Sequence, residues 1–297
     1  MGTVLTLDRG ARVAEAPRPD AAPEVEVPEV AALRSLHRRL ADQPHLRPGP
    51  EVDGLFGALV RLVLDTPLDR EPGVLGAPVV QAIRASLHAL CSEGEYQLEL
   101  AWARRIAASP APRRELARFP YADNYRRLAR LELDLLAEVT DGRPRRVAFI
   151  GSGPLPLSSL LVAGELGAPV DNVDRDPAAV ALGERVARAL GSALAFRCAD
   201  VTALTATDLG AYDVVILAAL VGASGAEKRA VLDRLAATMA PGTVLLARSA
   251  RGLRSLLYPA IDPAALAGFE LQTVVHPVDD VVNSVVLARV PSRPGPR

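Results

Sequence analysis

The sequence predicts an α/β fold in which a seven-stranded, largely parallel sheet follows an all-helical N-terminal region. Apolar residues recur every three or four positions through the first 140 residues, which is typical of helices. From Arg145 onward, short apolar runs alternate with helical patterns, as in parallel strands joined by helical crossovers. A glycine-rich turn, Gly151–Ser158, follows the first of these runs and indicates a ligand-binding end of the sheet.

The N-terminal part divides into an extension and a helical domain. Residues 1–27 are rich in proline, alanine and acidic residues, and we expect them to be disordered. Residues 28–142 should form a helical domain that acts as a lid or binds the substrate. Its apolar residues keep helical spacing in four stretches, at residues 30–40, 52–63, 79–102 and 125–139.

Seven apolar runs of strand length occupy the rest of the chain. We expect strands at residues 145–150, 169–173, 193–198, 212–219, 243–248, 269–276 and 282–290. Only the turn Pro277–Asp280 separates the last two runs, so they should pair as an antiparallel hairpin at the edge of the sheet. A parallel sheet that ends in such a hairpin is typical of Rossmann-like methyltransferases, an analogy at the level of the fold.

The turn after the first strand indicates which nucleotide binds. Gly151 and Gly153 let the backbone approach a ligand closely. A dinucleotide fingerprint needs a third glycine where this chain has Pro156, and the lysine and hydroxyl pair of a P-loop is missing. Because both pyrophosphate-binding motifs are missing, S-adenosylmethionine is favoured as the cofactor. We therefore expect residues 143–297 to form a Rossmann-like domain that binds S-adenosylmethionine.

Further cofactor contacts are expected beyond the carboxyl ends of the strands. Asp174 is placed to accept hydrogen bonds from the ribose hydroxyls, and Asp200 from the adenine amino group. Each of these features alone is more often a structural turn or a helix cap, but their occurrence at successive strand ends supports a cofactor site. The expected cofactor-binding residues are Gly151, Ser152, Gly153, Asp174, Asp200, Leu217 and Ala218.

A carboxylate interrupts the apolar stripe of the third helical pattern. Leu87, Cys91, Glu95 and Trp102 keep helical spacing, which places Glu95 on the apolar face. Burying an unpaired charge costs several kcal/mol, so Glu95 is expected either to pair with an arginine or to carry a function. Gly94 clears space beside it, at a cost of about 1 kcal/mol relative to alanine.

A second cluster, Phe119–Tyr125, concentrates aromatic and amide side chains in a chain with 4% aromatic residues. It is either an ordinary loop that leads into the next helix or the polar wall of a pocket for amino-acid groups. In the second case Tyr121, Asn124 and Tyr125 contact the substrate.

Seven segments together resemble the nicotianamine synthase family, and they extend through the helical region that ordinary methyltransferases lack. The matching segments are Leu90–Glu95, Phe119–Tyr125, Val147–Leu157, Asp171–Pro177, Leu217–Gly222, Arg248–Ala250 and Val281–Val286. The chain departs from the family pattern at Gly94, where alanine is usual, at Arg251, where histidine is usual, and at Asp280, where glutamate is usual. Arg251 is expected to add a cation near the site and to affect which substrate is accepted.

The resemblance implies a transferase that moves the 3-amino-3-carboxypropyl group of S-adenosylmethionine to an amine. It releases 5′-methylthioadenosine and makes nicotianamine or a related metal-chelating metallophore. Glu95 is then the catalytic residue that takes the proton of the amine, and Tyr121 orients the amine. Arg248 is expected either to bind substrate carboxylates or to form a surface ion pair. A conventional small-molecule methyltransferase and a non-catalytic S-adenosylmethionine-binding protein are the alternatives.

Composition excludes several classes of function. A net charge of −1 provides no basic field to attract nucleic acid or anionic lipid. No apolar run approaches the roughly 20 residues of a membrane-spanning helix, and the first residues lack the layout of a signal peptide. We expect a cytoplasmic protein with a small-molecule amine or amino acid as its partner, and with neither nucleic acid nor membrane.

Cysteines and histidines indicate neither a disulfide nor a metal site. Cys91 and Cys198 lie in apolar helical and strand patterns, which predicts reduced core thiols. The histidines lack metal-ligand spacing, so no protein-bound metal is expected. They are His37, His45, His88 and His276.

Overall fold

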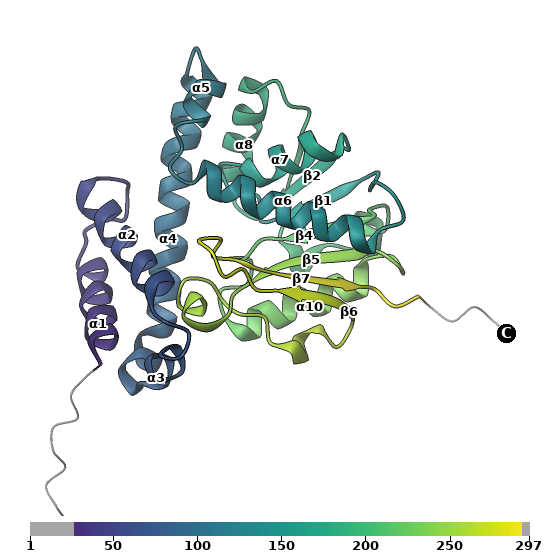
Figure 1. Ribbon diagram of the computed structural model, residues 1–297. Coiled ribbons are helices and arrows are strands. Elements are labelled where there is room, and N and C mark those ends of the chain that lie inside the picture. Colours follow the sequence, from purple (N-terminus) through teal and green to yellow (C-terminus); the bar gives the residue numbers. More distant parts are fainter. Residues whose placement is uncertain (1–26, 293–297) are drawn as a thin grey trace, which may run out of the picture.

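Seven strands form a single mixed sheet in the computed structural model, which describes residues 27–292 (Figure 1). Their order is β3-β2-β1-β4-β5-β7-β6; β1 to β5 run parallel, and β7 is antiparallel to both of its neighbours. The strands are β1 (Val147–Ile150), β2 (Val170–Asp174), β3 (Ala195–Cys198), β4 (Val214–Leu217), β5 (Val244–Ser249), β6 (Glu270–Val275) and β7 (Ser284–Arg289). The predicted Rossmann-like sheet and its antiparallel hairpin are confirmed. The predicted disordered extension lies outside the described residues, apart from Val27.

The central strands are buried along their whole length. Every residue of β1, β4 and β5 is buried, as expected for parallel strands covered on both faces. The edge strand β3 is largely exposed, and Cys198 at its end is exposed too. The prediction of a core thiol is therefore wrong for Cys198, because an edge strand leaves this side chain uncovered. Cys91 is half-buried, and neither cysteine forms a disulfide.

Four long helices occupy the four stretches with helical spacing. They are α1 (Pro28–Ala41), α2 (Pro50–Asp65), α4 (Pro78–Ala108) and α6 (Ala122–Val139). The first three begin with proline, whose missing N–H and fixed φ suit the first turn of a helix. The remaining helical segments are α3 (Glu71–Gly76), α5 (Pro112–Leu116), α7 (Leu157–Leu166), α8 (Pro177–Ala189), α9 (Ala206–Leu209), α10 (Gly225–Thr238), η1 (Val201–Ala203), η2 (Gly252–Leu256) and η3 (Pro263–Leu266).

Helix α4 connects the helical region to the sheet. Its Leu87 belongs to a core shared with α1, α2 and η2, whereas Ile106 packs in a second core with Val186 of α8. Helix α6 lies across one face of the sheet, where Leu128 and Leu136 are buried (Figure 1). Because both helices contact the sheet domain, the division near residue 142 stays a prediction. Within residues 27–292 no helix has the length and apolar character required to cross a bilayer.

Lys228 of α10 is buried with only a neutral partner. It is 1% exposed, and its Nζ donates a hydrogen bond to the carbonyl oxygen of Ala219 at 2.7 Å. Burial lowers the pKa of the Lys228 ammonium group to about 8, because a charge in an apolar environment loses its hydration.

Replacing Lys228 with methionine should change how stability depends on pH. Between about pH 8 and pH 10.5 the unfolded chain binds more protons at this lysine than the folded chain does. The unfolding free energy of the wild type should therefore rise across this window by about 3 kcal/mol relative to that of Lys228→Met. Urea titrations at several pH values measure the unfolding free energies of the two proteins. A difference between them that stays constant from pH 8 to pH 10.5 would contradict a lowered pKa of Lys228.

Candidate active site

A cavity of about 1200 Å³ lies where the helical region meets the carboxyl ends of the strands. Helices α2 and α4 and the start of α6 form one side, and the loops after β1, β2, β3 and β4 contribute to the other (Figure 1). The volume exceeds the roughly 300 to 1,000 Å³ of typical ligand pockets, so two small molecules fit at once. Eight acidic residues and four arginines line it, an excess that suits ligands carrying amine and sulfonium charges.

The predicted glycine turn forms one wall of the cavity. Gly151 and Gly153 have φ values of 82° and 63°, which only glycine adopts readily. A Cβ at Gly151 would lie 2.2 Å from Cγ2 of Val221, and one at Gly153 would lie 2.5 Å from Oε2 of Glu99. The turn therefore favours glycine at both positions for conformation, and at Gly151 for space as well, because the Glu99 side chain beside Gly153 can move aside.

Asp174 holds this turn in place. Its Oδ2 accepts a hydrogen bond from the backbone N–H of Gly153 at 2.8 Å, and its Oδ1 accepts one from the N–H of Asp176 at 3.0 Å. Asp174 lines the cavity, and each oxygen keeps a second lone pair for a ribose hydroxyl. The carboxylate thus has a structural contact in addition to its proposed role in cofactor binding.

The other predicted cofactor contacts divide into two groups. Ser152, Asp200 and Ala218 line the cavity. Asp200 also caps η1, because its Oδ1 accepts hydrogen bonds from the hydroxyl and N–H groups of Thr202, which lower the pKa of the Asp200 carboxyl. Leu217 is absent from the cavity wall: it is fully buried in the core on the side of the sheet that α10 covers. As the last residue of β4, Leu217 belongs to the packed sheet, whereas the next residue, Ala218, lines the cavity.

Replacing Asp174 with alanine should weaken S-adenosylmethionine binding by about 1.5 to 3 kcal/mol, the range for hydrogen bonds to a charged group. Titration calorimetry on the folded variant measures the effect. Asp171→Asn is the matched control: Asp171 lies on the same strand but bonds Arg146 and Tyr212 outside this cavity. Unchanged affinity in Asp174→Ala would refute the ribose assignment.

Glu95 lies on the cavity wall, and its partner is a tyrosine. Oε2 of Glu95 accepts a hydrogen bond of 2.8 Å from the hydroxyl of Tyr258, which follows η2. Burial raises the pKa of the Glu95 carboxyl, while the Tyr258 hydrogen bond and the nearby Arg248 charge oppose the rise. No arginine among residues 27–292 forms an ion pair with Glu95, and the nearby Arg248 is paired with Glu132.

A second acid, Glu99, follows Glu95 after one turn of α4. Its Oε1 accepts a hydrogen bond of 3.0 Å from the hydroxyl of Tyr125. Burial, the Glu95 charge and the Asp174 charge together raise the pKa of Glu99 well above its ordinary value. Sequence reasoning missed Glu99, although the four-residue spacing from Cys91 to Glu95 continues to it and signals the same helix face.

The aromatic cluster predicted at residues 119–125 packs against α4. The ring of Phe119 makes edge-to-face contacts with Trp102, Tyr121 and Tyr125, at centroid distances of 5.7 to 6.0 Å. Tyr121 and Tyr125 both line the cavity. Burial raises the pKa of the Tyr121 and Tyr125 hydroxyls, and the Glu95 charge contributes, so both stay protonated as hydrogen-bond donors.

Arg248 forms a buried ion pair. Its Nε and Nη2 donate to the two oxygens of Glu132 at 2.7 and 3.0 Å, and Nη2 also donates to Oγ of Ser158 at 2.9 Å. Glu132 is fully buried and Arg248 is 6% exposed, so the alternative of a surface ion pair is wrong. Arg248 also lines the cavity, and its Nη1 has no hydrogen-bond partner among residues 27–292.

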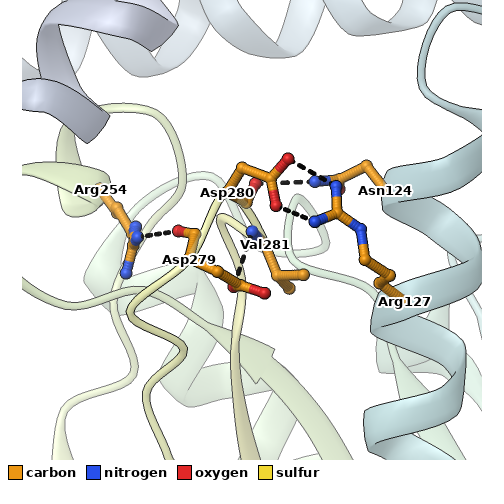
Figure 2. Close-up of polar contacts among 6 residues, drawn as sticks. All are labelled: Asn124, Arg127, Arg254, Asp279, Asp280 and Val281. Atoms are coloured by element: carbon orange, nitrogen blue, oxygen red, sulfur yellow. Dashed lines mark hydrogen bonds and ion pairs between the residues drawn. The ribbon is translucent and has the colours of Figure 1, made fainter.

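The loop between β6 and β7 contributes Asp280, Val282 and Asn283 to the cavity wall. Figure 2 shows the polar contacts that hold this loop. Asn124 of α6 donates to the carbonyl oxygen of Asp280 at 2.7 Å, and Arg127 forms a two-pronged ion pair with the Asp280 carboxylate. On the opposite side of the loop, Arg254 donates to the carbonyl oxygen of Asp279. The loop is thus held between α6 and η2, and the amide of Asn124 already has a structural partner.

The expected effect of Arg251 is not supported by its position. Arg251 is exposed at the start of η2 and is not among the residues that line the cavity. Its charge acts on His276, whose pKa is lowered first by burial and then by Arg251. The added cation therefore lies outside the cavity wall.

Two polar side-chain atoms in the cavity wall are buried without a hydrogen-bond partner in the described structure. They are Oγ of Ser152 and Nδ2 of Asn283. Together with the glycine turn and Asp174 they fit a small zwitterionic nucleoside such as S-adenosylmethionine. No group of three or more His, Cys, Asp or Glu residues within 27–292 is arranged to hold a metal ion.

Comparisons with known proteins agree on one family. A family model described as nicotianamine synthase protein matches residues 23–293. The chain is 46% identical over 280 residues to nicotianamine synthase 1 of Oryza sativa subsp. indica, which covers 90% of this chain and 83% of the rice protein. It is 44% identical over 268 residues to nicotianamine synthase 9 of Hordeum vulgare, with 88% and 78% covered.

Solved structures share the fold. MtNAS in complex with MTA and tNA has a TM-score of 0.77 at 23% identity, covering 88% of this chain and 97% of that one. A mutant of MtNAS in complex with S-adenosylmethionine has a TM-score of 0.76 at 22% identity, covering 90% and 99%.

Proposed function

The chain belongs to the nicotianamine synthase family, and from that premise we propose which residues carry its reaction. The enzyme transfers the 3-amino-3-carboxypropyl group of S-adenosylmethionine to an amine and releases 5′-methylthioadenosine. The observation that carries the assignment is the Glu95 carboxylate, which is held by Tyr258 on the wall of a cavity that also reaches the glycine turn.

The reaction requires a neutral amine and a place for its proton. S-adenosylmethionine supplies a sulfonium whose neighbouring methylene carbon is electrophilic. The amine forms a C–N bond to that carbon while the C–S bond breaks and its electron pair goes to sulfur, so a neutral thioether leaves. The new ammonium group then gives a proton to a carboxylate. Because amines are mostly protonated at neutral pH, a positioned carboxylate also prepares the amine for attack.

Glu95 is the proposed proton acceptor. Burial raises the pKa of its carboxyl, while the Tyr258 hydrogen bond and the Arg248 charge favour the ionised form. Burial and the negative charges of Glu95 and Asp174 raise the pKa of Glu99 well above its ordinary value, so we propose that Glu99 is the protonated member of the pair. We propose that these neighbouring carboxyl groups divide the acid and base roles, an arrangement typical of acid–base sites.

The aromatic and polar walls are proposed to orient the acceptor. Tyr121 lies within the field of Glu95, and we propose that its hydroxyl oxygen accepts a hydrogen bond from the amine N–H or that its O–H donates one to an adjacent carboxylate. Tyr125 fixes Glu99, and Asn124 fixes the loop at Asp280. Nη1 of Arg248 is the guanidinium nitrogen available to a substrate carboxylate, so both Arg248 and Asn124 combine a structural contact with proposed substrate binding.

The nucleoside product tests this proposal. Purified protein incubated with S-adenosylmethionine and candidate amino acids should release 5′-methylthioadenosine, because proximity selects the methylene rather than the methyl carbon. Mass spectrometry should find an amino-acid product that gains one aminobutyrate unit for each cofactor consumed. Such a product has enough amines and carboxylates to chelate a divalent transition metal. S-adenosylhomocysteine with a methylated acceptor would instead identify a methyltransferase.

A further inference from the structure

Gly94 occupies an unusual place in helix α4. It lies in the interior of a 31-residue helix, where glycine costs about 1 kcal/mol relative to alanine. A Cβ at this position would lie 2.3 Å from Cζ and 2.5 Å from Cε2 of Phe56 on α2, closer than real Cβ atoms approach. The ring of Phe56 thus fills the space of a side chain at position 94.

The same ring belongs to the cavity wall. Helix α2 presents an apolar stripe with four-residue spacing to the cavity, formed by Val52, Phe56, Val60 and Leu64. Phe56 is the aromatic member of this stripe, and its contact with Gly94 places the ring against the turn of α4 that carries Glu95. Gly94 and Glu95 line the cavity beside it. The phenyl ring of Phe56 and the Glu95 carboxylate therefore belong to the same cavity wall and come together at one turn of α4.

We propose that Phe56, packed against Gly94, determines which acceptors are used, because its ring limits the size of the amine that can reach Glu95. This inference rests on the proposed function, in which Glu95 takes the proton of the acceptor. The glycine turn and Asp174 belong to the sheet region, whereas Phe56 belongs to α2 in the helical region. A change at Phe56 should therefore alter acceptor choice more than S-adenosylmethionine binding.

A competition experiment tests the size limit. Wild-type protein and Phe56→Ala are each given S-adenosylmethionine with equal concentrations of glycine, L-alanine, L-histidine and L-tryptophan. Mass spectrometry measures every amine that gains an aminobutyrate unit, including products that gain further units. The ratio of large to small accepted amines should rise about fivefold or more in Phe56→Ala, since removing several methylene-sized groups from a pocket wall changes discrimination by at least this much. Phe56→Leu, which keeps more of the apolar volume, should shift the ratio in the same direction.

The contact with Gly94 gives a second, independent readout. Gly94→Ala should change the ratio while Phe56 is present, because the methyl group displaces the ring. In a chain that already carries Phe56→Ala, the added Gly94→Ala should have less than about a twofold effect, because residues in contact couple. Additive effects of the two substitutions would overturn the inference.

Leu62→Ala is the matched control. Leu62 is a partly buried residue of α2 in the same core as Phe56, but it does not line the cavity. The variant should keep the wild-type ratio, and an equal shift would overturn the inference because it would show general loosening of α2. A wild-type enzyme that releases 5′-methylthioadenosine while Phe56→Ala keeps the wild-type ratio would also overturn it. Release of S-adenosylhomocysteine by the wild type would refute the proposed function instead.

Discussion

Replacing Glu132 with glutamine is expected to lower the unfolding free energy by about 3 to 5 kcal/mol, the cost of leaving a buried charge without its partner. The Arg248 guanidinium bonds both oxygens of Glu132, and neither residue has appreciable contact with solvent. A glutamine keeps the shape of the side chain but removes the negative charge, so the loss measures the charge rather than the packing. Urea denaturation should show a lower midpoint with an unchanged slope.

Two further variants test whether the loss of stability comes from the Glu132–Arg248 ion pair or from any change in α6. Glu138→Gln lies on the exposed side of the same helix and should change stability by less than about 0.5 kcal/mol. The double variant Glu132→Leu with Arg248→Met should recover much of the loss, because apolar residues of similar volume often replace a buried ion pair without cost. A loss below about 1 kcal/mol in Glu132→Gln would show that Arg248 finds another anion.

The sheet and its cofactor turn could be predicted from the sequence because their signals are local. Alternation of apolar runs and helical patterns fixed the strand positions to within two residues. The requirement for glycine at Gly151 and Gly153 follows from the sharp turn after β1, and the structure adds the physical reason in their positive φ values. Asp174 was placed by the same logic, since the carboxyl ends of neighbouring parallel strands meet.

The partners of the acids could not be predicted, because they come from distant parts of the chain. Tyr258, which bonds Glu95, is 163 residues away in sequence and follows a short 3₁₀ segment without a motif of its own. Likewise, Glu132 pairs with Arg248 across 116 residues. Helical spacing indicates which face a residue occupies, but only the packing of α4 and α6 on the sheet decides which residue it meets.

Errors arose where a pattern was taken as a measure of burial or contact. The apolar run around Cys198 predicted a core strand, but an edge strand carries the same pattern with its side chains exposed. Leu217 was predicted to contact the cofactor, because the end of β4 lies at the right edge of the sheet. Its side chain is buried in the core instead, and the next residue, Ala218, lines the cavity. A single step along a strand exchanges the two faces.

Replacing Glu95 with glutamine should lower turnover by about 10² or more, the usual scale for a positioned acid or base. The amide oxygen of glutamine can still accept the Tyr258 hydrogen bond, so the fold and the cavity wall should persist. S-adenosylmethionine affinity should be unchanged, because the glycine turn and Asp174 are untouched. Release of 5′-methylthioadenosine measures turnover, and titration calorimetry measures affinity on the same preparation.

Glu93→Gln supplies the control for this prediction, because Glu93 lies on the exposed side of the same helix and bonds Gln97 outside the cavity. It should retain wild-type turnover. If Glu95→Gln released 5′-methylthioadenosine at the wild-type rate, the carboxylate would be structural, and the proton would have to pass to water or to another group. A rate loss in Glu95→Gln alone, with both variants folded and binding S-adenosylmethionine equally, places the role of Glu95 after S-adenosylmethionine binding, because the two changes remove the same charge from the same helix.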